Sequence, residues 1–91
     1  MSNLNYVIVR SSPSGVWFGQ LVESERQRYT LKNARRVWSW EGAASCTGLA
    51  KKGPTGGKIC APVDVVVHEV CECISASAEA IAAFAEIAIW E

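Results

Sequence analysis

The sequence predicts an α+β fold: a small, strongly bent antiparallel sheet or barrel of about six to seven short strands, with two short helices. The first forty residues hold β-branched and aromatic runs separated by brief turn signals, a pattern typical of consecutive antiparallel strands. Further on, apolar residues recur at helical spacing in two alanine-rich stretches. The length of 91 residues, 49% of them hydrophobic, predicts a single domain over residues 1–91 with one modest core.

Four strands are predicted in the first part of the chain, over residues 6–10, 16–23, 27–32 and 35–40. The segments between the first three are turns by composition. A tight turn is expected at Asn33, because asparagine tolerates the left-handed backbone conformation. Gly19 predicts a bulge or a close backbone approach inside the second strand. With such short connections, an antiparallel meander is the simplest arrangement.

The second half of the chain predicts two helices and three further strands. Gly53-Pro54 ends the first helix, and the residues that follow are expected to form a flexible loop. Ser75 or Ser77 can cap the second helix, and a tight turn or bulge is expected at His68-Glu69. The predicted ranges are 42–50 and about 75–85 for the helices, 55–58 for the loop, and 63–67, 70–74 and 87–90 for the strands.

Charge is distributed unevenly along the chain, although the net charge is zero. Residues 1–58 carry nine basic and three acidic groups, a balance of +6, whereas residues 59–91 carry six acidic groups and no basic one. These halves can pair within one domain, face a neighbouring copy, or leave a positive surface for an anionic ligand. The zero net charge argues against non-specific DNA binding, and we expect no specific DNA binding either.

The amino terminus lacks a basic stretch followed by an apolar core, so no signal peptide is expected. No window approaches about eighteen apolar residues, so no membrane partner is expected and the thiols should be reduced in a cytosol. Structural zinc usually uses paired C-x₂₋₄-C ligands, whereas Cys71-Glu72-Cys73 has no matching pair. No metal or cofactor is therefore predicted, and buried thiols are expected at Cys46, Cys60, Cys71 and Cys73.

Catalysis is not predicted. His68 is the single histidine, and no Ser, Asp or Cys arrangement around it follows a known nucleophile pattern. We therefore expect His68 to be a surface turn residue and the protein not to be an enzyme.

The segment 33–45 is the most informative part of the sequence, since it contains two adjacent arginines and two tryptophans two residues apart. On a strand, alternation places Arg36, Trp38 and Trp40 on one face, and Arg35 with Val37 on the other. A face with cation and indole together suits cation–π stacking, nucleobase stacking or a subunit contact. The sequence alone does not choose among these three.

Five cations occur between residues 26 and 36 without one carboxylate. On a meander, the outward residues of the third strand would lie beside the fourth, giving a basic patch edged by aromatic rings. We therefore expect a ligand-binding surface, and its candidate residues are Arg28, Lys32, Arg35, Arg36, Trp38 and Trp40. The alternative is that the tryptophans are core or interface anchors and the arginines pair with Glu69, Glu72 or a neighbour's acidic half.

Four stretches of the sequence together carry a resemblance to a known family: Tyr6–Arg10, Ser14–Leu21, Asn33–Ala44 and Leu49-Ala50. They resemble a family of short tailed-phage and prophage proteins known as a domain of unknown function. The likeness spans about residues 5–50, returns at 87–90, and does not include 51–61. The resemblance implies a phage origin and a host cytoplasm, and it implies no activity or assigned site.

Together these features predict a phage-encoded, host-cytoplasmic, non-enzymatic homo-oligomer that binds a small anionic nucleotide. In a phage, such a protein would sequester a nucleotide signal of host defence. A virion accessory or protein-interaction protein without a small-molecule ligand is the alternative, with the same tryptophans in a subunit contact. Sequence-independent single-strand binding is a third hypothesis, and it requires a steep loss of affinity with salt.

Overall fold

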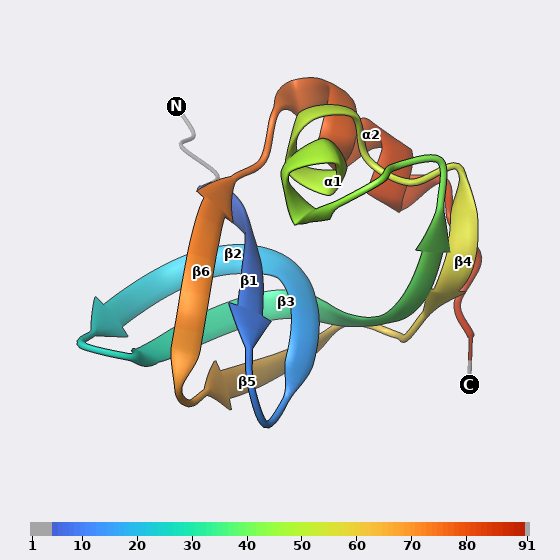
Figure 1. Ribbon diagram of the computed structural model, residues 1–91. Coiled ribbons are helices and arrows are strands. Elements are labelled where there is room, and N and C mark those ends of the chain that lie inside the picture. The colour runs from blue at the N-terminus through green and yellow to red at the C-terminus, as the bar shows by residue number, and fades with distance from the viewer. Residues whose placement is uncertain (1–4, 91) are drawn as a thin grey trace.

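The computed structural model describes residues 5–90. Six strands form one antiparallel sheet that bends strongly without closing, and two helices pack at one end of it (Figure 1). The predicted α+β class with two short helices is confirmed, in the form of a bent sheet rather than a barrel. The elements are β1 (Tyr6–Ser11), β2 (Gly15–Glu25), β3 (Arg28–Glu41), α1 (Cys46–Lys52), β4 (Gly56–Ile59), β5 (Val63–Val67), β6 (Val70–Ser75) and α2 (Ala78–Ala85).

The long strand β3 joins the parts of the sheet. One of its edges pairs with β2, and its other edge pairs first with β5, over residues 29–34, and then with β4, over residues 37–41. The sheet continues from β2 through β1 to β6. In Figure 1, β3 therefore runs from the β2–β3 hairpin at one side of the molecule to β4 at the other.

The predicted tight turn at Asn33 is wrong, because the two strands expected on either side of it are one strand. Asn33 does have a left-handed backbone, with φ of 52°, but it lies in a β-bulge. Asn33 and Ala34 together stand opposite the single residue Gly19 of β2. The prediction of a bulge or a close approach at Gly19 is confirmed, since a Cβ there would lie 2.8 Å from the Cα of Ala34.

The sheet buries side chains on both faces. The first core is built from strands alone, and its buried members are Val7, Val9, Trp17, Leu31, Ala34, Val67 and Val70. The second core lies between the other face and the helices, and its buried members are Ile8, Phe18, Val37, Leu49, Ala50, Ile59 and Phe84. Because the bulge at Asn33 reverses the alternation, Leu31 and Ala34 both enter the first core.

Ser77, one of the two predicted caps, begins α2. Its Oγ accepts a hydrogen bond from the backbone N–H of Ala80 at 3.0 Å and donates one to the carbonyl of Lys51 at 2.6 Å. The backbone N–H of Ser77 also donates to the carbonyl of Ala50. One serine therefore provides hydrogen-bond partners for backbone groups at the start of α2 and at the end of α1.

Two further predictions about the second half are wrong, and one is confirmed. Residues 55–58 are not a flexible loop, since most of this segment belongs to β4. Residues 87–90 are not a strand and make only one parallel bridge, between Ile59 and Ile89. The tight turn at 68–69 is present, with Glu69 at φ of 55°. Among residues 5–90, no helix is long and apolar enough to cross a bilayer.

Replacing Gly19 with alanine is expected to destabilise the protein by about 1–3 kcal/mol, because the new Cβ has to displace the β3 backbone at Ala34. Urea unfolding followed by circular dichroism measures the change. Gly56→Ala is the matched control, since its Cβ would meet only the flexible carboxylate of Glu41, at 3.3 Å. Equal destabilisation by the two substitutions would contradict the close approach at Gly19.

Candidate functional site

Arg36 packs against two indole rings. Its guanidinium carbon is 4.7 Å from the ring centroid of Trp17 and 5.4 Å from that of Trp38. Trp17 is the residue of β2 directly opposite Arg36 in the register, so the sheet itself sets the first contact. The second contact is with Trp38, which lies on the same face of β3 as Arg36, as their two-residue spacing predicts.

The stacking continues toward the carboxyl end of the chain. The rings of Trp38 and Trp90 meet edge to face at 6.4 Å, and Lys58 Nζ lies 5.5 Å from the Trp90 ring centroid. The backbone N–H of Trp90 donates to the carbonyl of Ile59 at 2.9 Å, which fixes this tryptophan beside β4. We call the set of alternating cations and rings the cation–aromatic row; its members are Trp17, Arg36, Trp38, Trp90 and Lys58.

Arg36 has no anionic partner among residues 5–90. The two ion pairs in this part of the chain join Arg10 to Glu72 at 3.2 Å and Arg28 to Glu25 at 2.9 Å. The Nε of Arg36 is buried without a hydrogen-bond acceptor in the described structure. Stacking on two rings therefore holds this guanidinium in place and leaves its charge available to an external anion.

A surface depression of about 390 Å³ adjoins Arg36. It lies between β3 and the turn that connects β1 with β2, and Ser12 and Ser14 of that turn belong to its lining. Trp38 is 58% exposed and offers an accessible ring beside it. Its lining residues are Ser12, Pro13, Ser14, Gly15, Val16, Arg36, Val37, Trp38 and Trp40.

Trp40 does not share the face of Arg36 and Trp38, so that part of the prediction is wrong. The register of β3 against β4 shifts between Val37 and Ser39, which reverses the alternation. The ring of Trp40 packs against the second core instead, and its Nε1 donates to the carbonyl of Ala43 at 2.9 Å. Trp40 also belongs to the lining of the depression next to Arg36.

The expected basic patch beside these rings does not form. Arg28 is eight residues from Arg36 along β3 and pairs with Glu25 across the β2–β3 hairpin. Lys32 is exposed opposite Gln20, before the bulge. Because β3 runs on instead of turning back at residue 33, Arg28 and Lys32 precede Arg36 on the same strand, and neither contacts the rings of Trp17 and Trp38.

Arg35 points to the opposite face of the sheet and is only 7% exposed. Its guanidinium donates to the carbonyls of Cys60 and Phe84, each at 2.8 Å. Burial lowers the pKa of Arg35, although an arginine side chain keeps its proton in proteins. Of the six sequence-predicted residues, the structure therefore brings together Arg36 and Trp38, with Trp40 at their edge.

Sequence reasoning missed Trp17, Lys58 and Trp90 as members of the row. Trp17 could be placed opposite Arg36 only with the β2–β3 register known. Lys58 and Trp90 approach Trp38 through tertiary contacts that no local pattern carries.

The cysteines are free thiols, but they are less buried than predicted. Cys71 is exposed, while Cys46, Cys60 and Cys73 are partly buried. Within residues 5–90 no group of three or more His, Cys, Asp and Glu side chains is placed to hold a metal ion. His68 is exposed in the turn between β5 and β6, as expected.

Comparison with family models identifies a family to which most of the chain matches. A family model described as a domain of unknown function, DUF6948, matches residues 4–84, which include every strand and all but the last residue of α2. This range includes the segment 5–50 in which the sequence resemblance was expected, continues through residues 51–61, which the resemblance left out, and ends before residues 87–90. Neither the curated proteins nor the solved structures contain a match.

We expect iodoacetamide to alkylate Cys71 first at pH 8, and Cys46 and Cys73 more slowly. Burial raises the pKa of both slower thiols, and Glu72 adds to the effect at Cys46. These thiols ionise at a lower pH in the unfolded state than in the native state. Above about pH 8.5 the native state therefore binds more protons than the unfolded state, and the free energy of unfolding falls as pH rises. Peptide mass spectrometry gives the three rates.

The urea-denatured protein is the control, and its cysteines should react at similar rates. If Cys73 reacted as fast as Cys71 in the folded protein, the burial of Cys73 would be contradicted.

Proposed function

The chain belongs to the DUF6948 family, and we propose that it is a non-enzymatic binding protein for a small anionic ligand that carries a flat ring. Small nucleotides are the class that fits this description best. The observation that carries the proposal is Arg36, a cation stacked on Trp17 and Trp38 with no carboxylate partner among residues 5–90.

The geometry of Arg36 suits an anion that approaches from the side. A guanidinium is planar and directs its N–H groups along its own plane. Because Nε of Arg36 is buried, an anion would be bound through the two terminal nitrogens, beside the rings of Trp17 and Trp38. Charge-assisted hydrogen bonds of this kind are about twice as strong as neutral ones. A phosphate at the Arg36 edge of the depression would also come within reach of Ser12 and Ser14.

The exposed rings supply the second part of the recognition. Trp38 is 58% and Trp90 is 41% exposed. A base stacked on such a ring gains about 1–3 kcal/mol without a requirement for a particular base. Lys58, next to Trp90, supplies a second cation for a ligand with more than one phosphate.

Self-association forms part of the proposal. Ile89, 54% exposed, lies next to Trp90 in the chain, so large apolar side chains gather beside the cation–aromatic row. A second copy that covered these side chains would also enclose a ligand on Trp38 and exclude water from its phosphate contacts. Such a homo-oligomer would be more stable than a single small domain.

The biological setting in the proposal rests on the phage resemblance and on the class of ligand. A phage protein of this kind would act in the host cytoplasm and sequester a nucleotide signal used in host defence.

One observation favours a second candidate function. The exposed Trp38, Ile89 and Trp90 have the character of anchors in protein–protein contacts. In that case the protein is a virion accessory or interaction protein, and the row is buried by a partner without any small-molecule ligand.

Native mass spectrometry of the untagged protein, purified gently from bacterial cells, tests the proposal. A closed oligomer with extra mass of a few hundred daltons per site supports it and identifies the ligand. Arg36→Ala is expected to abolish the extra mass while circular dichroism shows an intact fold. Lys32→Ala, which removes an exposed cation elsewhere on β3, is the matched control and should retain the ligand. A ligand retained by both variants would overturn the assignment to Arg36.

Trp38→Ala separates the two candidate functions. If Trp38 stacks on a base, its loss weakens ligand binding about 5- to 150-fold, as measured by titration calorimetry, while the oligomer persists. If Trp38 is a contact anchor, sedimentation shows that the variant dissociates, and the unsubstituted protein binds no nucleotide.

A further inference from the structure

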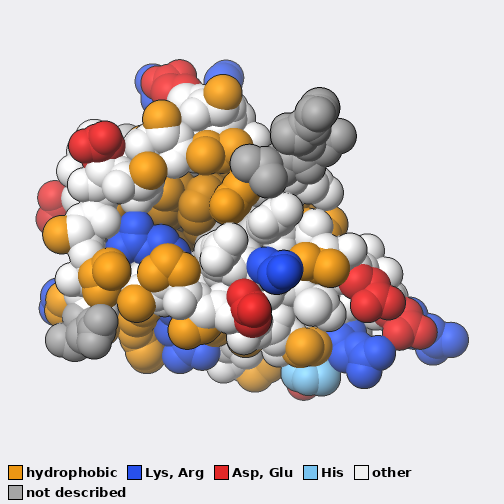
Figure 2. Space-filling model, turned by 180° about the vertical axis from the view of Figure 1, so that it is seen from behind, with side chains coloured by type: hydrophobic (Ala, Val, Ile, Leu, Met, Phe, Trp, Pro, Cys, Tyr) orange, Lys and Arg blue, Asp and Glu red, His pale blue; other side chains and the backbone are white. Residues whose placement is uncertain are grey.

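A cavity of about 510 Å³ lies on the face of the sheet opposite Arg36, beneath the end of α2. Aromatic and branched aliphatic side chains form most of its wall, and the face shown in Figure 2 is hollowed where such side chains gather, with basic atoms at the edge of the hollow. Its lining residues are Tyr6, Phe18, Asn33, Arg35, Pro62, Ile81, Phe84, Ala85, Ile87, Ala88 and Ile89.

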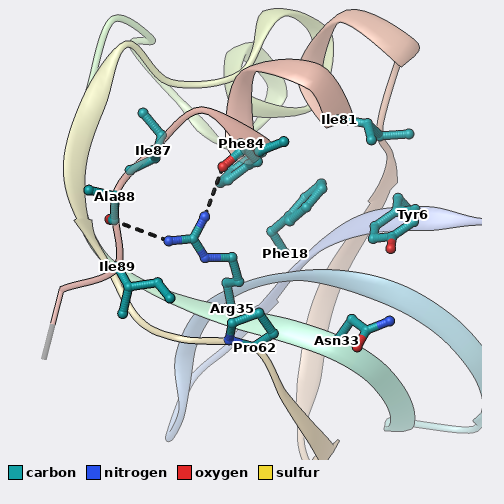
Figure 3. A pocket seen from close by; sticks show the side chains of 11 residues that line it. Tyr6, Phe18, Asn33, Arg35, Pro62, Ile81, Phe84, Ile87, Ala88 and Ile89 are labelled. Atoms are coloured by element: carbon teal, nitrogen blue, oxygen red, sulfur yellow. Dashed lines mark hydrogen bonds between the residues drawn. The ribbon is translucent and has the colours of Figure 1, made fainter.

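The charged group in this wall is Arg35. Figure 3 shows its guanidinium reaching across the cavity between Phe18 and the segment that holds Ala88. In addition to the two bonds at 2.8 Å to Cys60 and Phe84, Nη2 donates to the carbonyls of Ile59 at 3.1 Å and Ala88 at 3.4 Å. All four acceptors are neutral peptide carbonyls.

These bonds leave the charge of Arg35 without a counterion among residues 5–90. A guanidinium has five N–H donors, and four acceptors within the described structure leave one N–H of Nη1 without a partner. The carbonyl end of α2 supplies about half a negative charge at most. Because a buried cation is costly unless it is paired, the site favours the arrival of an anion.

A purely structural role for Arg35 accounts for only part of this arrangement. The four bonds do tie the end of α2 and the 87–90 segment to the end of β4. However, these hydrogen bonds could form without an open apolar cavity beside the guanidinium. The volume is also within the range of about 300–1,000 Å³ that is common for small-molecule sites.

We propose that this cavity binds an amphiphilic monocarboxylate, with the carboxylate on Arg35 and an aliphatic chain against Phe18, Ile81 and Phe84. The chemistry differs from that of the cation–aromatic row. A nucleotide carries several charges and polar edges, and this wall offers one cation among mostly apolar groups. The proposal therefore rests on a different cation from the function proposed for Arg36.

Calorimetric titration of the unsubstituted protein with decanoate and with decanol, both below their aggregation concentrations, tests the role of the charge. Decanoate is expected to bind at least tenfold more tightly, because only it forms charge-assisted hydrogen bonds with Arg35. Equal affinities would show that the cavity recognises apolar chains alone and would overturn the proposal. Failure of decanoate to bind would also overturn it.

A blocking variant tests the place of binding. Ala85 is exposed at the rim of the cavity, so Ala85→Trp should fill the entrance and reduce decanoate affinity at least tenfold. Ala82→Trp is the matched control, since Ala82 is exposed on the same helix and lies outside the cavity lining. Thermal melting followed by circular dichroism checks that both variants fold. Unchanged affinity in Ala85→Trp would place the ligand elsewhere.

Arg36→Ala separates this proposal from the preceding one. It should leave decanoate binding within about twofold of the unsubstituted protein, whatever its effect on nucleotides. Loss of decanoate binding in folded Arg36→Ala would contradict a site that belongs to Arg35.

Discussion

The close approach of Gly19 to Ala34 determines the path of β3, and both candidate sites depend on that path. A Cβ at position 19 would lie 2.8 Å from the β3 backbone, so only glycine allows two residues of β3 to stand opposite one residue of β2. The bulge lets β3 continue past Asn33 instead of turning back. The second half of the strand then reaches α2 with one face and Trp17 with the other, and it presents Arg35 and Arg36 to these different surroundings.

The fold class and several elements follow from local patterns, and the misplaced parts have identifiable causes. The turn at residues 68–69 and the cap at Ser77 depend on signals within a few residues, which is why they could be predicted. Asn33 was misinterpreted because a left-handed asparagine suits a tight turn and a bulge equally well. The strand β4 was missed because its two glycines show no side-chain alternation, and its pairing with β3 is a long-range contact.

The same distinction applies to the candidate site. The contact between Arg36 and Trp38 was predictable, since it follows from two-residue spacing on a strand. The position of Trp40 could not be predicted in this way, because the register of β3 against β4 shifts at Trp38 and reverses the alternation before Trp40. The contacts of Trp90 depend on where the chain returns after α2, which local sequence does not encode.

Arg35 and Arg36 are neighbours in the chain, yet the protein accommodates their charges by different physical means. Four peptide carbonyls surround one guanidinium, and the other packs against two indole rings. The 87–90 segment contributes to both environments, because the Ala88 carbonyl accepts from Arg35 while the Trp90 ring contacts Trp38. The bridge between Ile59 and Ile89 and the packing of Ile87 against the second core also hold this segment, so the contacts around the two cations add to a position that the sheet and the core already support.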